Sequence, residues 1–321
     1  MQRNQLRDGR NITSVELIDG KKYFKKKVVG VEEDASKRYQ NLINWEELKQ
    51  FNTNIHSPSL LKKNKEKKEL VYEYLENTIS LEDIMDNKNS DSLFLIRKAT
   101  QILVDLHSFD FSRTNIEIEV SKVNRRDNIL NLNKYEYASF TGAEIELFSL
   151  LQNDKEFINV IDKKIDNENY TFCHGDIRLD QFLFDNEKNM WIIDFEEMCI
   201  GDPMRDLAGI IGSLYFNSLL KTFSSTTQET SNIAEVESHF IDKGTVYIEE
   251  TKPLLKEILS TYSNNREIDK LKLYTNIGWF IIERIISRAK FTYRMSPVDK
   301  AILGIGREII VNPLELEDMF N

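Results

Sequence analysis

The sequence predicts an α+β fold, with a small β-rich lobe at the N-terminus and a larger, mainly helical lobe after it. Three observations support this prediction. Alternating apolar and polar residues fill the first part of the chain, helical spacing of apolar residues fills the rest, and a short β-like island at 170–195 interrupts the helical part. We therefore expect an N-terminal domain of residues 1–75 and a second domain of residues 76–321.

The strands of the small lobe are predicted from turn signals. Asp19-Gly20 separates two alternating runs within residues 12–29, which indicates a β-hairpin. Apolar residues at helical spacing predict a helix over 32–51, and two further strands flank the charged turn at 64–68.

The larger lobe is predicted to be helical because its apolar residues recur every three or four positions. Helices are expected over residues 80–86, 91–109, 143–165, 204–222 and most of 230–293.

Composition limits the class of protein. The 321 residues have a formal net charge of -10, which disfavours a nucleic-acid binder and favours a cationic small molecule or a basic peptide as partner. Cys173 and Cys199 fit neither a metal-site spacing nor a disulfide framework. The N-terminus does not resemble a signal peptide, and no apolar run reaches membrane-spanning length. We expect a cytoplasmic protein that does not enter a membrane.

The acids of the β-like island suggest a specific chemistry. Asp176 lies in "HGDIRLDQ", Gln181 follows five residues later, and Asp194 ends an apolar strand eighteen residues beyond Asp176. Phosphoryl transfer requires a carboxylate to orient a hydroxyl and hard oxygen ligands for Mg²⁺. Asp176 suits the first role, and Asp194 with Gln181 suits the second. Arg178 suits contact with the transferred phosphate, because a guanidinium matches phosphate oxygens.

These motifs together resemble the catalytic core of the aminoglycoside phosphotransferase and choline kinase family, relatives of the protein kinases. The family pattern is His-x-Asp, an Asn five residues on, an Ile-Asp-Phe or Ile-Asp-Trp strand end, and Gly-Asp-Pro-x-x-Asp-Leu-Ala. The matching positions within residues 12–210 include His174, Asp176, Gln181, Asp194, Phe195, Gly201, Asp202, Pro203 and Asp206. The resemblance implies a bilobal protein-kinase-like fold and the cofactors ATP and Mg²⁺. It also implies that Asp176 is the catalytic base and that Gln181 and Asp194 are metal ligands.

The resemblance also implies how the nucleotide is held. "ELVYEYLEN" matches the segment where backbone groups bind adenine, which assigns the carbonyl of Glu73 and the amide of Leu75. A lysine of the small lobe would hold the α and β phosphates, and Lys25, Lys26 and Lys27 are all candidates. Lys26 is favoured because Phe24 and Val28 share its face, although any of the three could be a solvated charge.

Three features depart from the family pattern. Gln181 stands where the family has Asn, and the loop "RDGRNIT" carries a single glycine, Gly9. The helix glutamate that pairs with the lysine is not evident: Asn44 occupies its register, with Glu46 and Glu47 nearby.

Two functions remain open at this point. The first is an ATP-dependent phosphotransferase that acts on a hydroxyl group of an amino sugar, a choline-like amine or a peptide Ser or Thr. Arg178 is a basic residue two positions after Asp176, where the protein kinases have a lysine. This similarity keeps a Ser or Thr peptide among the possible acceptors. The alternative is a degenerate kinase-like module that binds nucleotide or a partner without turnover.

Overall fold

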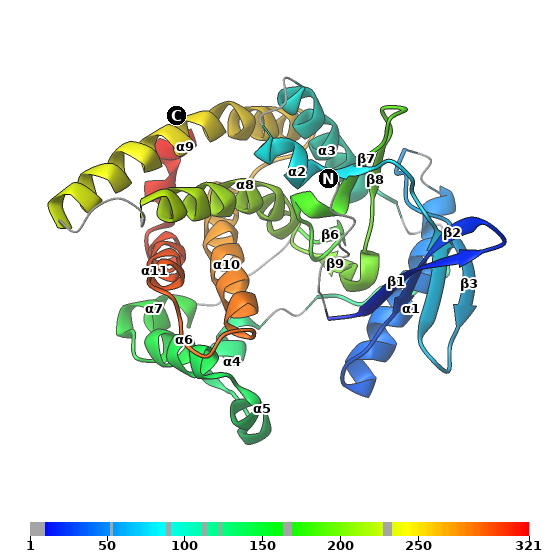
Figure 1. Ribbon diagram of the computed structural model, residues 1–321, viewed down its shortest axis with the longest axis horizontal. Helices are drawn as coiled ribbons and strands as arrows, with labels where there is room; N and C mark the ends of the chain where they lie inside the picture. The colour runs from blue at the N-terminus through cyan, green and yellow to red at the C-terminus, as the bar shows by residue number, and fades with distance from the viewer. Residues whose placement is uncertain are drawn as a thin grey trace. The chain divides into compact units, whose positions relative to one another are not determined.

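The computed structural model describes residues 10–51, 54–87, 91–110, 114–121, 124–162, 169–226 and 233–320. The chain forms two compact units (Figure 1). The first unit comprises residues 1–120 and 171–200, and the second comprises 121–170 and 201–321. This division groups residues by their packing. The predicted boundary after residue 75 separates a nucleotide-binding lobe from a catalytic and substrate-binding lobe. It is a functional division and stays a prediction.

The first unit contains a four-stranded antiparallel sheet in the order β1-β2-β4-β3. The strands are β1 (Ile12–Ile18), β2 (Lys21–Lys27), β3 (Leu60–Asn64) and β4 (Glu69–Glu73). Asp19 and Gly20 join β1 to β2 with positive φ angles of 51° and 75°. Two successive positive φ angles are typical of a hairpin turn that matches strand twist, so the predicted hairpin is confirmed.

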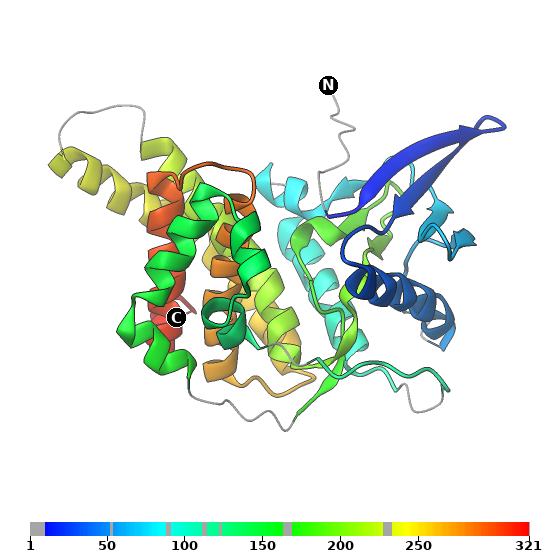
Figure 2. The same ribbon diagram turned by 90° about the horizontal axis from the view of Figure 1, so that it is seen from below.

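Helix α1 (Glu32–Leu48) packs on this sheet (Figure 2). The apolar face of α1 packs against Val28, which follows β2, and against Leu70 and Tyr72 of β4. A short 3-10 turn, η1 (Lys49–Phe51), follows the helix. The buried residues of this core are Val28, Ala35, Tyr39, Leu42, Ile43 and Leu70. Lys26 lies two residues before Val28, so its side chain is on the face of β2 that α1 covers.

The β-like island forms short strands in the same unit. β5 (Ile79–Ser80), β7 (Phe182–Phe184) and β8 (Met190–Ile192) make a three-stranded sheet, and β6 (Thr171–Cys173) pairs with β9 (Cys199–Gly201). Two 3-10 turns in the segments that connect these strands carry polar residues. They are η3 (Leu179–Gln181), before β7, and η4 (Phe195–Glu197), between β8 and β9. Helices α2 (Leu81–Asp86) and α3 (Ser92–His107) complete the unit.

The described part of the second unit is mainly helical. Helix α10 (Lys270–Ala289) packs against both α8 (Pro203–Thr226) and α11 (Pro297–Val311) (Figure 1). The remaining elements are α4 (Arg125–Leu130), α5 (Lys134–Ser139), α6 (Gly142–Gln152), α7 (Lys155–Ile161), α9 (Ile233–Ser263), η5 (Pro313–Leu316) and α12 (Glu317–Phe320). Among the helices described in both units, none has the length and apolar content that a membrane span needs.

Two predicted helices are divided by caps. The helix expected over 143–165 stops at Gln152, and α7 restarts after Asp154, whose side chain accepts from the amide of Phe157. Asp269 caps α10 in the same way, which divides the helical segment expected over 230–293. Short acceptor side chains at such positions compensate helix amides that have no partner, so they favour a new helix start.

Arg307 of α11 ties this helix to the start of α7. Its Nε lies 2.7 Å from Asp154 Oδ2, and its Nη2 lies 2.6 Å from Glu156 Oε2. The hydrogen bond from Arg307 lowers the pKa of Asp154 despite the opposing effect of partial burial. Asp154 is therefore both a helix cap and half of an ion pair.

The substitution Asp154→Asn separates these two roles, because Asn also caps helices but carries no charge. The depressed pKa of Asp154 means that its charge stabilises the folded state above the unfolded pKa of about 3.9, and that this stabilisation is lost as pH falls through the folded pKa. We expect the variant to unfold more easily than wild type at pH 7, by about 1 kcal/mol. In urea titrations the two proteins should converge as the pH falls through the lowered folded-state pKa of Asp154.

Glu308→Gln is the control, because Glu308 is a half-exposed partner of the same arginine. It should change the unfolding free energy little at either pH. A loss in Asp154→Asn that persists at low pH would assign the effect to the cap instead of the charge.

Candidate active site

The loop that carries Asp176 is tied at both ends to one residue of the neighbouring strand segment. The Nε2 atom of His174 lies 3.0 Å from the carbonyl oxygen of Ile193. The amide of Ile193 in turn donates to the carbonyl of Gln181 at 3.1 Å. Because Ile193 directly precedes Asp194, these two bonds hold the 174–181 loop beside the Asp194 backbone.

Asp194 has a left-handed backbone, with φ 73° and ψ 52°. This conformation is uncommon outside glycine, although Asp tolerates it better than most residues. Phe195 follows and stacks on Trp45 of α1, with ring centroids 3.6 Å apart. Packing of the next side chain therefore fixes a backbone turn that costs of order 1 kcal/mol or more.

Lys26 of β2 reaches two carboxylates of this turn. Its Nζ contacts Asp194 Oδ1 and lies 2.7 Å from Glu196 Oε2, and its side chain is only 7% exposed. Burial by itself would lower the pKa of Lys26, but the charges of Asp194 and Glu196 outweigh it and raise the pKa. Burial likewise opposes ionisation of Asp194, but Lys26 lowers the pKa of that carboxyl. The pair is therefore fully charged at neutral pH.

The lysines on either side of Lys26 lie on the opposite face of β2. Lys25 pairs instead with Glu16 at 3.2 Å and with Glu69 at 3.4 Å on the neighbouring strands. Lys27 is half-buried, and no contact between it and Asp194 occurs among the described residues.

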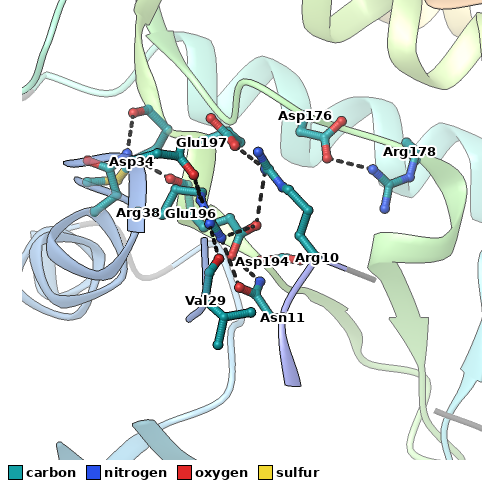
Figure 3. A network of polar contacts seen from close by, with 12 residues as sticks. Arg10, Asn11, Val29, Asp34, Arg38, Asp176, Arg178, Asp194, Glu196 and Glu197 are labelled. Atoms are coloured by element: carbon teal, nitrogen blue, oxygen red, sulfur yellow. Dashed lines mark hydrogen bonds and ion pairs between the residues drawn. The ribbon is translucent and has the colours of Figure 1, made fainter. Parts of the chain in front are cut away.

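Helix α1 meets Glu196 with a cation and an amide. Arg38 Nη1 lies 3.5 Å from Glu196 Oε1 (Figure 3). Asn41 donates to the Glu196 carbonyl oxygen at 2.8 Å. From the other side Asn11 donates to Glu196 Oε2 at 2.6 Å. Glu196 is thus the centre of a polar network that Lys26 also joins.

The helix acids suggested by the sequence lie elsewhere. Glu46 pairs with Lys49 at 2.8 Å, and Glu47 is exposed. Asn44 accepts a hydrogen bond from Gln40. In the described part of the chain, none of these three helix residues contacts Lys26.

Asp176 and Arg178 form an ion pair within the loop (Figure 3). Arg178 Nη1 donates to Asp176 Oδ2 at 2.6 Å, and its Nε donates to Asp180 at 3.0 Å. Burial disfavours the charge of Arg178, but the two carboxylates outweigh it and raise its pKa. The Asp176 side chain is 46% exposed and remains accessible to a ligand.

Gln181 is buried with its amide unsatisfied. The residue is 3% exposed, and neither its Oε1 nor its Nε2 has a hydrogen-bond partner among the described residues. A buried polar atom without a partner costs about 1–3 kcal/mol, so a ligand is the natural explanation for it. An amide oxygen beside a carboxylate is a donor set that Mg²⁺ accepts, so Gln181 and Asp194 fit this metal.

Glu73 and Leu75 lie where the chain leaves the four-stranded sheet. Glu73 is the last residue of β4, and its carboxylate accepts from the amide of Ser59 at 2.7 Å. Leu75 follows the strand, and its carbonyl accepts from Thr78 Oγ1 at 3.3 Å.

Residues 47–229, more than half of the chain, match the family model described as the phosphotransferase enzyme family. The chain belongs to this family. It is therefore an enzyme, a phosphotransferase, as the sequence predicted.

Solved structures share the fold of this phosphotransferase at low sequence identity. Spectinomycin phosphotransferase APH(9)-Ia, in complex with ADP and spectinomycin, is 14% identical, with a TM-score of 0.51 over 97% of this chain and 91% of that one. A variant of aminoglycoside 2'-phosphotransferase-IIIa, as its GDP complex, is 12% identical, with a TM-score of 0.52 over 98% and 91%. The predicted kinase-like α+β fold is confirmed. A comparison with curated proteins found no match to this chain.

Glu196 and the polar residues around it were not predicted from the sequence. Arg38 carried a detectable signal, because it is a charged residue within the otherwise apolar stripe of Ala35, Leu42 and Trp45 on α1. Asn11 and Asn41 carried none, since isolated asparagines are common at turns and on helix surfaces. Gly9, the glycine of the expected phosphate loop, lies outside the described residues.

Gly175 allows the loop of this phosphotransferase to approach η4. Its φ is +87°, and a Cβ at this position would lie against the Glu197 carbonyl oxygen and 2.8 Å from the carbonyl carbon. Only glycine combines this backbone with this close approach.

We expect Gly175→Ala to destabilise the protein by about 2 kcal/mol or more, because the added methyl meets backbone that cannot move aside. Gly20→Ala is a matched control, since Gly20 has a similar φ of +75° but open space around it. That variant should lose only about 1 kcal/mol. Urea unfolding of both measures the difference, and equal losses would show that the contact with Glu197 does not matter.

Proposed function

We propose that this phosphotransferase moves the γ-phosphoryl group of ATP to a hydroxyl group of an acceptor. The observation that supports this most is the meeting of Lys26 with Asp194, beside the loop that carries Asp176. A buried cation, a metal-binding carboxylate and an accessible carboxylate are the groups that phosphoryl transfer requires.

The residues of the chain then have separate roles. Asp176 accepts the hydroxyl proton, the acceptor oxygen forms a bond to the γ-phosphorus, and the bond from that phosphorus to its bridging oxygen breaks. ADP leaves with the electron pair of that bond. Lys26 and Arg178 offset phosphate charge, so positioning and electrostatics contribute most of the rate enhancement.

Asp194 and Gln181 would hold Mg²⁺. The metal supplies charge neutralisation at the phosphate oxygens when bound. The side-chain amide of Gln181, which has no hydrogen-bond partner among the described residues, supports this assignment. Gln is one methylene longer than the Asn of the family pattern, but it offers the same kind of amide oxygen. The carbonyl of Glu73, the last residue of β4, and the amide of Leu75, two residues beyond it, would bind the adenine, as the family resemblance implies.

The acceptor is a small molecule or a peptide with a free hydroxyl group. The net charge of -10 favours a cationic acceptor. The solved structures of similar fold include a spectinomycin phosphotransferase and an aminoglycoside 2'-phosphotransferase, so amino sugars of the aminoglycoside kind are a first class to test. Arg178 keeps Ser and Thr peptides as a second class. We also propose that the protein acts in the cytoplasm.

Asp176→Asn tests the proposed chemistry. The amide cannot take the hydroxyl proton, so we expect turnover to fall at least about 100-fold while nucleotide still raises the melting temperature. Mass spectrometry of amino sugars, choline-like amines and Ser or Thr peptides after incubation with ATP and Mg²⁺ provides the readout.

Lys25→Met and Lys26→Met form a matched pair for the same assay. Lys25→Met should transfer phosphate like wild type, since its partners are Glu16 and Glu69. Lys26→Met should weaken both nucleotide binding and turnover. If nucleotide stabilises the wild type but no acceptor gains phosphate, the alternative of a binding module without turnover is favoured.

Gln181→Met tests the metal assignment. Methionine fills a similar volume without polar atoms, so the nucleotide-free variant should be at least as stable as wild type. The additional rise in melting temperature that Mg²⁺ gives to the ATP complex should be lost. Gln181→Asn, the residue of the family pattern, should retain that rise. A normal Mg²⁺ effect in Gln181→Met would remove Gln181 from the metal site.

A further inference from the structure

We infer that Glu196 is the positioning residue for Lys26, and that α1 holds Glu196 through Arg38 instead of supplying an acid to the lysine. This inference rests on the proposed function, in which Lys26 binds phosphate. It assigns a role to three residues that the motifs do not include: Glu196, Arg38 and Asn11.

Lys26 requires a second carboxylate for a physical reason. Its Nζ is buried and contacts both Asp194 and Glu196. Asp194 is proposed to bind metal, and a carboxylate oxygen that binds metal offers less charge to an ammonium group. Glu196, 2.7 Å from Nζ and almost fully buried, is the acid that remains to hold the lysine in place.

Both oxygens of Glu196 have partners that fix its orientation. Oε2 accepts from Asn11 at 2.6 Å and faces Lys26. Oε1 faces Arg38 at 3.5 Å and Arg10 at 3.4 Å. The carbonyl of the same residue accepts from Asn41. Side chain and backbone are therefore held from three directions, which is what a positioning group requires.

Arg38 is itself held by its own hydrogen bonds. The residue is 1% exposed. Its Nε donates to Asp34 at 2.8 Å, its Nη2 to the Val29 carbonyl at 2.6 Å, and its Nη1 to Asn11 at 2.8 Å (Figure 3). A planar guanidinium with this many fixed bonds has one orientation, which presents positive charge to Glu196.

The resulting order of charges alternates in sign: Arg38, Glu196, Lys26 and Asp194. An acid on α1 in place of Arg38 would put another carboxylate next to Glu196, which already shares Lys26 with Asp194. Like charges at this separation repel in a buried site, so this network is consistent with the absence of a helix acid at Lys26.

The first experiment is a double-mutant cycle on the protein without nucleotide. Lys26→Met, Glu196→Gln and the double variant are unfolded in urea. If the two side chains interact, the double variant loses clearly less stability than the two single losses added together. Additive losses would overturn the pairing whatever the protein binds or transfers.

The second experiment uses Glu196→Gln with Glu197→Gln as the matched control. The Glu197 carboxylate contacts Arg10 and is 30% exposed. We expect Glu196→Gln to weaken binding of a non-hydrolysable ATP analogue with Mg²⁺ and to raise KM for ATP, each at least tenfold, with a smaller change in kcat. Glu197→Gln should stay within about twofold of wild type.

Two conservative variants keep the test valid if Glu196→Gln folds poorly. Glu196→Asp retains the negative charge and should recover part of the affinity for the ATP analogue. Arg38→Lys should weaken that affinity, because an ammonium group cannot reproduce the planar set of N–H donors of the guanidinium. If the wild-type protein neither binds the ATP analogue nor transfers phosphate, the proposed function is refuted. The double-mutant cycle in urea then still tests the interaction between Lys26 and Glu196. Active wild type with equal Glu196→Gln and Glu197→Gln kinetics would overturn the inference itself.

Discussion

The site depends on one buried ammonium group. Lys26 lies under α1 on the inner face of β2, where the carboxylates of Asp194 and Glu196 compensate the loss of water around its charge. An unpaired buried charge costs several kcal/mol, so the sheet, the helix and the 194–197 turn must be placed together for any of them to be stable here. The interaction that links these three elements is therefore both structural and chemical.

That requirement explains two unusual backbone features. Asp194 takes a left-handed conformation, and Gly175 takes another while it passes against the carbonyl of Glu197. Stacking of Phe195 on Trp45 and the bonds of Ile193 to His174 and Gln181 compensate the cost. Strain of this kind is retained where the surrounding contacts define a single geometry. Here that geometry holds the loop of Asp176 beside the turn of Asp194.

The sequence was informative where local rules decide. Asp19-Gly20 predicted its turn, and alternation along β2 distinguished Lys26 from Lys25, because one face of a strand is covered and the other is not. It was uninformative about Glu196, because the choice between acids depends on which elements pack together. It also joined α6 to α7, since the periodicity of apolar residues continues through a cap.

The cations around Lys26 are already paired with carboxylates, which favours binding of ATP together with Mg²⁺ over binding of ATP alone. Arg10, Arg38 and Lys26 already face Glu196, Glu197, Asp34 and Asp194, and Arg178 is shared by Asp176 and Asp180. Each described cation of this network has a carboxylate partner, so a bare triphosphate would add negative charge to an acidic site. A divalent ion held by Asp194 and Gln181, as proposed, would reverse that balance, because it would attract the phosphates and weaken the attraction of Asp194 for Lys26. Glu196 would then hold the ammonium group of Lys26 while that group faced the phosphates, so metal binding and the placement of the lysine would be linked.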